Sequence, residues 1–175
     1  MLVYFLRHAS AGDPKNDPLK DEKRPLDREG VEQCGYVGRA LAVLETHVDV
    51  IISSPLKRAT QTASLVANEL AYENKIELVP ALRPEAAFAQ FRDLLTRYGN
   101  QEAIMVVGHN PNLSEFLGRL IGGGGRAGID LKKGAVARVE VDHHRGVLHW
   151  CLTPKVLRVL MQASQPEPRA NSNRK

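Results

Sequence analysis

Four side chains suited to phosphoryl transfer each follow a predicted strand. They are Arg7, His8, Arg58 and His109. The apolar runs that precede them cover residues 2–6, 48–52 and 103–107. Histidine can act as a neutral nucleophile or a charged donor near neutral pH, and the planar arginine fork binds phosphate oxygens bidentately. Because phosphoryl transfer depends mainly on positioning and charge stabilisation, this combination of side chains suits that reaction.

The elements that carry these side chains alternate between strand and helix. The predicted strands are residues 2–6, 48–52, 76–79, 103–107, 136–141 and 146–152, of which the last two form a hairpin. The predicted helices are residues 26–44, 53–70, 88–99, 111–121 and 154–161. This alternation predicts an α/β fold, a three-layer sandwich with a mostly parallel central sheet flanked by helices. Ligands of such sheets bind at the carboxyl ends of the strands, so we expect the four side chains to meet at one edge.

Residue types also predict how the helices begin. Asp27 is predicted to cap the helix that follows it. Ser53-Ser54-Pro55 is predicted to begin the next helix, with capping as its main role. Pro111 opens the helix after the fourth strand, whose N-terminal N–H groups would attract an anion. Residues 9–25 are polar, contain three prolines, and are predicted to form a loop.

Length and composition narrow the class of protein. The 175 residues fit one domain, predicted to span residues 1–163, with a disordered tail at 164–175. Much of the net charge of +4 lies in this tail, so the body is too weakly basic to predict nucleic-acid binding. Two cysteines are too few for a disulfide framework, and no run is long enough to cross a membrane. We therefore predict a cytoplasmic protein with neither nucleic acid nor membrane as a partner.

Three sequence blocks resemble those of a known family. Leu6-Arg7-His8-Ala9, the segment from Ser53 to Thr62, and Gly108-His109-Asn110-Pro111 are similar to the signature blocks of the histidine phosphatase superfamily. Arg24-Pro25-Leu26, followed by Gly30, and the short length resemble its SixA-like phosphohistidine phosphatase branch. The resemblance covers about residues 1–160 and implies a phosphoglycerate-mutase-like fold. It also implies that no cofactor and no metal take part.

The resemblance also implies roles for individual residues. His8 would be the nucleophile and become a phosphohistidine, while Arg7 and Arg58 would hold the phosphoryl oxygens. His109 would donate to the phosphate in the transition state, and Arg24 would be an added phosphate ligand of this branch. The chain has room for only one helix between the third and fourth strands, so it lacks the large cap insertion of larger relatives. We expect a shallow, open site.

Three further residues are candidates for substrate binding. Ser10 and Asn110 are polar and lie close in sequence to the two histidines. Glu85 lies in the region where many relatives have a carboxylic acid that protonates an alkoxide leaving group. Because the imidazole of phosphohistidine is a far better leaving group than an alkoxide, a phosphohistidine substrate would need such an acid less.

The sequence leaves more than one function open. The first is a phosphatase acting on phosphohistidine in a signalling or phosphotransfer protein and releasing inorganic phosphate. The second is a small-molecule phosphomonoesterase of the same fold. The third is a non-catalytic module that binds phosphate or a phosphoprotein. A metal site at His143, His144 and His149 is not predicted, because these residues lie in a hairpin without ligand spacing.

Overall fold

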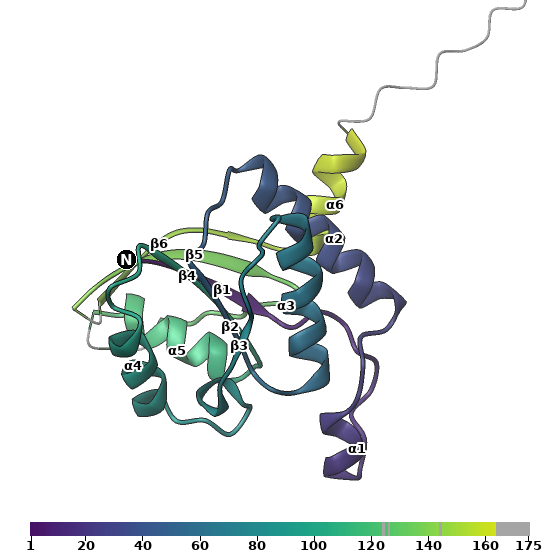
Figure 1. Cartoon of the computed structure of the whole chain (residues 1–175), viewed down its shortest axis with the longest axis horizontal. Helices are drawn as coiled ribbons and strands as arrows, with labels where there is room; N and C mark the ends of the chain where they lie inside the picture. Colours follow the sequence, from purple (N-terminus) through teal and green to yellow (C-terminus); the bar gives the residue numbers. More distant parts are fainter. Residues whose placement is uncertain (124, 126, 144, 164–175) are drawn as a thin grey trace, which may run out of the picture.

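A six-stranded mixed sheet forms the centre of the protein. The computed structural model describes residues 1–163 except 124, 126 and 144. The strands are β1 (Leu2–Arg7), β2 (Val50–Ser53), β3 (Glu77–Leu78), β4 (Ala103–Gly108), β5 (Val136–Asp142) and β6 (Arg145–Leu152), in the order β3-β2-β4-β1-β5-β6. The first four strands of this order pair in parallel, and β5 and β6 form the predicted antiparallel hairpin. The predicted α/β fold with a mostly parallel sheet is confirmed (Figure 1).

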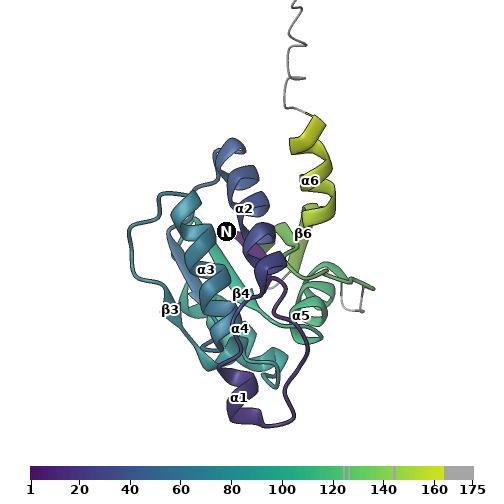
Figure 2. The same cartoon turned by 90° about the vertical axis from the view of Figure 1, so that its right-hand side faces the viewer.

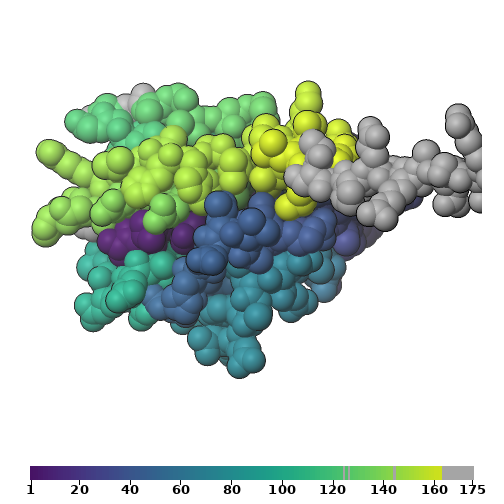
Figure 3. All heavy atoms as spheres, turned by 90° about the horizontal axis from the view of Figure 1, so that it is seen from above, coloured from purple at the N-terminus to yellow at the C-terminus, as the bar shows by residue number. Residues whose placement is uncertain are grey.

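Helices cover both faces of this sheet. In chain order the helices are α1 (Pro18–Glu22), α2 (Arg28–Val43), α3 (Lys57–Glu69), the short 3₁₀ turn η1 (Pro80–Leu82), α4 (Phe88–Arg97), α5 (Asn112–Ile121) and α6 (Pro154–Ala163). Helices α2 and α3 share one apolar cluster with the sheet, and α4 and α5 share the other. Seen from above in Figure 3, α6 lies along α2.

The central strands pack into both clusters, because they alternate side chains between the two faces. On one face Phe5 packs against Phe91, and on the other Tyr4 contacts Trp150. All six residues of β4 are buried. The two strands that end beside each other, β1 and β4, are therefore the buried central pair of the sheet.

The structure differs from the sequence predictions in residues 9–25 and at the start of α3. Residues 9–25 were predicted to be a loop, yet α1 forms there, capped by the Asp17 side chain and with Pro18 in its first turn. Helix α3 begins at Lys57 rather than at Ser53-Ser54-Pro55, and its N-cap Leu56 has no side-chain cap bond. The predicted capping role of the two serines is therefore wrong, because their hydroxyls form other bonds.

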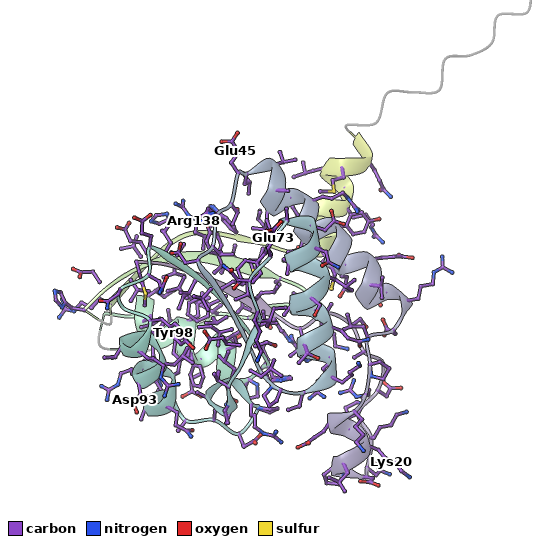
Figure 4. All side chains as sticks on the ribbon, viewed as in Figure 1. Lys20, Glu45, Glu73, Asp93, Tyr98 and Arg138 are labelled. Atoms are coloured by element: carbon purple, nitrogen blue, oxygen red, sulfur yellow. The ribbon has the colours of Figure 1, made fainter. Side chains whose placement is uncertain are left out.

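Helix α1 lies at the bottom of the molecule, apart from the two helical layers, in the views of Figures 1 and 2. None of its residues is buried. Lys20, labelled in Figure 4, lies at the outer end of this projection. The segment predicted to be a tail, residues 164–175, lies outside the described residues. Within the described part of the chain, no helix is both long and apolar enough to cross a membrane.

Candidate active site

The register between β1 and β4 brings the two histidines together. Arg7 is paired with Gly108, so His8 and His109 are the first residues beyond a matched pair of strand ends. The His8 backbone N–H also donates to the Gly108 carbonyl at 3.0 Å. The two imidazole rings are 4.9 Å apart between centroids, and both side chains are buried.

A hydrogen bond of the His8 ring determines which of its two nitrogens can react. Nδ1 lies 2.8 Å from the carbonyl oxygen of Ala9. A carbonyl can only accept, so Nδ1 carries the hydrogen and, in the neutral ring, Nε2 carries the lone pair. Burial, with Arg58 and Arg7 acting in the same direction, lowers the pKa of His8 to about 4. His8 is therefore a neutral imidazole at neutral pH, with a nucleophilic Nε2.

Two guanidinium groups flank this ring, and each is anchored through one nitrogen. Arg7 donates from Nη1 to the Leu131 carbonyl at 2.7 Å. Arg58 donates from Nη1 to the Asp21 carbonyl at 3.0 Å, with the Asp21 carboxylate at 3.2 Å. In both arginines the Nε atom is buried and has no partner among the described residues.

His109 adds a third unpartnered nitrogen. Its Nε2 lies 2.8 Å from the Ser54 hydroxyl, while its Nδ1 is buried with no partner in the described structure. Burial lowers the pKa of His109 to about 2, and His8, Arg58 and Arg7 act in the same direction. Buried polar groups without partners are rare in folded proteins. Three of them around one nucleophile suit a tetrahedral oxyanion, whose oxygens can accept from all three.

Arg24 lies at the same site and is held by the loop before α2. Its Nε donates to Asp21 at 2.8 Å, and its Nη1 donates to the carbonyl of Ala11 at 2.7 Å. Its charge contributes to the lowered pKa of His8. Arg24 therefore adds positive charge near the nucleophile, although its hydrogen bonds are to the protein itself.

Ser10 and Asn110, the two candidate polar contacts, are bonded to the protein rather than left unpartnered. The Ser10 hydroxyl donates to Asp27 at 2.8 Å, beside the Asp27 cap of α2 that the sequence predicted. The Asn110 amide donates to the Leu131 carbonyl at 3.0 Å and accepts from Ser114 at 2.9 Å. Since Arg7 bonds the same carbonyl, Asn110 helps to hold the acceptor that orients Arg7.

Glu85 is ion-paired. Its carboxylate accepts from Arg83 at 2.6 Å, and Arg83 also bonds Glu22. The hydrogen bond from Arg83 holds the pKa of Glu85 below its ordinary value. A carboxylate in this state holds a proton poorly, so it is ill suited to be a general acid.

The sequence analysis overlooked three residues that organise the site. Asp21 orients Arg24 and Arg58. Ser54 contacts His109. Thr62 accepts from the Ala9 N–H at 3.1 Å and donates to the Arg58 carbonyl at 2.8 Å. The sequence Asp17-Pro18, an N-cap followed by proline, was a signal for α1 and hence for Asp21.

A metal centre does not arise from the described side chains. Within the described residues, no three or more His, Cys, Asp or Glu side chains come together as ligands. The polar groups around His8 are predominantly nitrogen donors, which bind an anion rather than a cation.

Comparison with known proteins relates this site to a family. Residues 3–90 match the family model of the histidine phosphatase superfamily (branch 1). An uncharacterized protein of Picosynechococcus is 32% identical over 139 residues, 78% of this chain and 82% of the relative. The phosphohistidine phosphatase SixA of Escherichia coli is 25% identical over 158 residues, covering 88% of this chain and 94% of that protein.

A solved structure of the protein histidine phosphatase SixA complexed with tungstate has the same fold. Its TM-score is 0.80 at 24% sequence identity, and the match covers 90% of this chain and 99% of that one. The predicted absence of a large cap insertion is thus confirmed by a relative of nearly the same extent.

Proposed function

Because the chain belongs to the histidine phosphatase superfamily, we propose that it hydrolyses phosphohistidine on a protein, by way of a covalent phosphoryl intermediate on His8. The observation that carries this proposal is the set of three unpartnered buried nitrogens, on Arg7, Arg58 and His109, around a neutral histidine nucleophile. A phosphoryl group carries negative charge and acceptor oxygens, with which these nitrogen donors can pair.

The first step transfers the phosphoryl group to His8. Nε2 of His8 attacks the phosphorus in line, the Nε2–P bond forms, and the P–N bond to the substrate imidazole breaks. Arg7 and Arg58 neutralise the charge that spreads over the phosphoryl oxygens. The leaving imidazole carries a solvent-derived proton on its other ring nitrogen, so the enzyme supplies no proton.

The second step returns His8 to its starting state. Water attacks the phosphorus, the P–Nε2 bond breaks, and inorganic phosphate departs with the proton lost by the water. Throughout, Nδ1 of His8 keeps its hydrogen bond to Ala9, so Nε2 regains its lone pair without tautomer exchange.

The state of the nearby carboxylates favours phosphohistidine over a phosphate ester. An alkoxide leaving group requires a proton from a general acid. The carboxylates of Asp21, Glu22 and Glu85 all accept bonds from arginines, and the lowered pKa of Asp21 and of Glu85 favours the charged form. The 25% identity to a phosphohistidine phosphatase over most of the chain supports the same substrate class. The cytoplasmic location of the protein stays a prediction.

A comparison of two substrates tests the proposal. The protein is incubated with a phosphohistidine-containing phosphotransfer protein and with an aryl phosphate, each with and without a chelator. We expect faster hydrolysis of phosphohistidine, an acid-labile and alkali-stable phosphoryl label on the enzyme, and no effect of the chelator. His8→Ala should abolish both the label and turnover.

Each alternative has its own outcome in this experiment. Preference for phosphoesters, together with a large loss in Glu85→Gln, would identify a small-molecule phosphomonoesterase. Binding of phosphate without any turnover would identify a non-catalytic module. Full activity of His8→Ala would overturn the covalent mechanism.

A further inference from the structure

The surroundings of the His109 ring determine its charge state. The ring is surrounded by positive charge, from Arg7 on β1, Arg58 on α3 and Arg83 after η1, and by the His8 ring just after β1. These neighbours and burial disfavour an imidazolium. If His109 donates a hydrogen bond to the phosphoryl group, the neutral ring must carry its single hydrogen on the nitrogen that faces the site.

The hydroxyl of Ser54 is the contact that decides where this hydrogen lies. Ser54 is fully buried, and two groups contact its Oγ. The backbone N–H of Leu56 donates to it at 3.4 Å, and Nε2 of His109 lies at 2.8 Å. An N–H can only donate, so the only acceptor among these contacts for the hydroxyl hydrogen of Ser54 is Nε2.

The opposite arrangement would leave a buried donor unsatisfied. If Nε2 carried the hydrogen and donated to Ser54, the hydroxyl hydrogen would have no acceptor among the described residues. Unsatisfied buried donors are avoided in folded proteins. Ser54 therefore donates to Nε2, and the hydrogen of the neutral ring lies on Nδ1.

We propose that Ser54 is a positioning residue that holds His109 as the neutral Nδ1–H tautomer, so that this nitrogen donates to the phosphoryl group of the substrate. Nδ1 is the buried nitrogen without a partner among the described residues, and the charges of Arg7 and Arg58 act on this ring. The inference rests on the proposed phosphatase function only for its catalytic consequence, because the tautomer itself is a property of the protein alone.

Ser54 thus has a role other than helix capping, and its neighbour Ser53 does not share this role. Ser53 donates its hydroxyl to the Ser54 carbonyl at 2.9 Å and is equally buried. Within the described structure, Ser53 makes no hydrogen bond to His109. The two adjacent serines differ in their contact with the ring, which makes Ser53 a matched control for Ser54.

The tautomer can be measured directly in the wild-type protein. With ¹⁵N-labelled histidine, long-range ¹H–¹⁵N correlation spectra distinguish a nitrogen that carries hydrogen from one that does not. We expect His109 to be neutral with the hydrogen on Nδ1 from neutral pH down to about pH 5. An Nε2–H tautomer, or an imidazolium at neutral pH, would overturn the proposal whether or not the protein proves to be a phosphatase.

Kinetics of Ser54 variants test the catalytic consequence. Ser54→Ala should lower kcat for phosphohistidine by about 10-fold or more with little change in KM, short of the roughly 100-fold or greater loss expected when a transition-state donor is removed in His109→Ala. Its His109 spectrum should lose the single Nδ1–H state. Ser54→Thr, which keeps the hydroxyl, should restore both, and Ser53→Ala should leave both unchanged.

The outcomes separate this inference from the proposed function. If wild-type protein shows no phosphohistidine turnover but His109 is the Nδ1–H tautomer, the function is wrong and the role of Ser54 in fixing the ring stands. If turnover is as proposed and the spectra of wild type and Ser54→Ala agree, the positioning role is wrong. A melting temperature for each variant shows whether a loss of activity reflects unfolding instead.

Discussion

The carboxylate of Asp21 in α1 lies 3.2 Å from Nη1 of Arg58. None of the residues of α1 is itself buried. The same carboxylate accepts from Nε of Arg24 at 2.8 Å. Two cations beside the nucleophile thus depend on one anion carried by α1. Since Glu22 of the same helix bonds Arg83, ion pairs connect α1 to Arg24, Arg58 and Arg83.

Removal of the Asp21 side chain should weaken substrate binding. Asp21→Ala removes the carboxylate that helps to orient Arg24 and Arg58 and leaves only their bonds to backbone carbonyls. We therefore expect KM for the phosphorylated substrate to rise about 10-fold, the scale of one charge-assisted hydrogen bond. Asp21→Asn keeps an oxygen acceptor and should lie between Ala and wild type. Steady-state kinetics measure both. Equal KM values for all three proteins would contradict an orienting role.

The lowered pKa of His8 predicts how stability depends on pH. The native ring, with a pKa of about 4 instead of 6.5, binds fewer protons than the unfolded chain between these pH values. The free energy of unfolding should therefore fall as the pH is lowered through this window. At about pH 5 the proton uptake of His8 on unfolding should have lowered the free energy of unfolding by on the order of 2 kcal/mol relative to neutral pH.

Urea unfolding of wild type and His8→Asn at neutral pH and near pH 5 checks this value. Because acidic residues lose stability over the same range in both proteins, the difference between the two isolates His8. We expect the wild type to lose more stability than His8→Asn. An identical loss would mean that the pKa of His8 is not lowered.

Asn110→Ala should destabilise the protein through the loop that orients Arg7. The substitution removes the amide that bonds Leu131 and leaves the Ser114 hydroxyl without the acceptor it uses. We expect a loss of about 1–3 kcal/mol in the free energy of unfolding, with a smaller rise in KM than in Arg7→Ala. Reduced substrate affinity without reduced stability would indicate instead that Asn110 contacts the phosphate, as the sequence suggested.

Gly30 marks the place where α2 meets the loop after β1. A Cβ at this position would lie 2.0 Å from the carbonyl oxygen of Ser10, a backbone atom that cannot move aside cheaply. Gly30→Ala should therefore destabilise the protein by several kcal/mol, of the order of 3, because overpacking displaces backbone. It should also disturb the bond between Ser10 and Asp27.

Gly35→Ala is the matched control in the same helix. A Cβ there would meet only the far end of the Arg39 side chain, and alanine stabilises a helix interior by up to about 1 kcal/mol relative to glycine. Thermal unfolding should place Gly35→Ala at or above wild type and Gly30→Ala well below. A Gly30→Ala protein as stable as wild type would refute the close approach.

Much of the fold was accessible from the sequence, because apolar periodicity reflects burial directly. Residues 2–6, 50–52 and 103–107, which lie in β1, β2 and β4, are all apolar because both faces of a central strand are covered. Helix α1 was overlooked because it buries nothing and so has no periodicity. Only its cap, Asp17 followed by Pro18, was visible in the sequence.

The order of residue types along the chain specifies which side chains follow which strands, and so it predicted that His8, Arg7, Arg58 and His109 would meet. How these side chains are held depends on the folded arrangement. Hydrogen bonds from Arg58 to Asp21, from Ser54 to His109 and between His8 and Ala9 depend on ångström-scale placement of groups up to 55 positions apart. Spacing along a chain specifies the strand that delivers a side chain; the partner of each nitrogen, and hence its charge and tautomer, follows from packing.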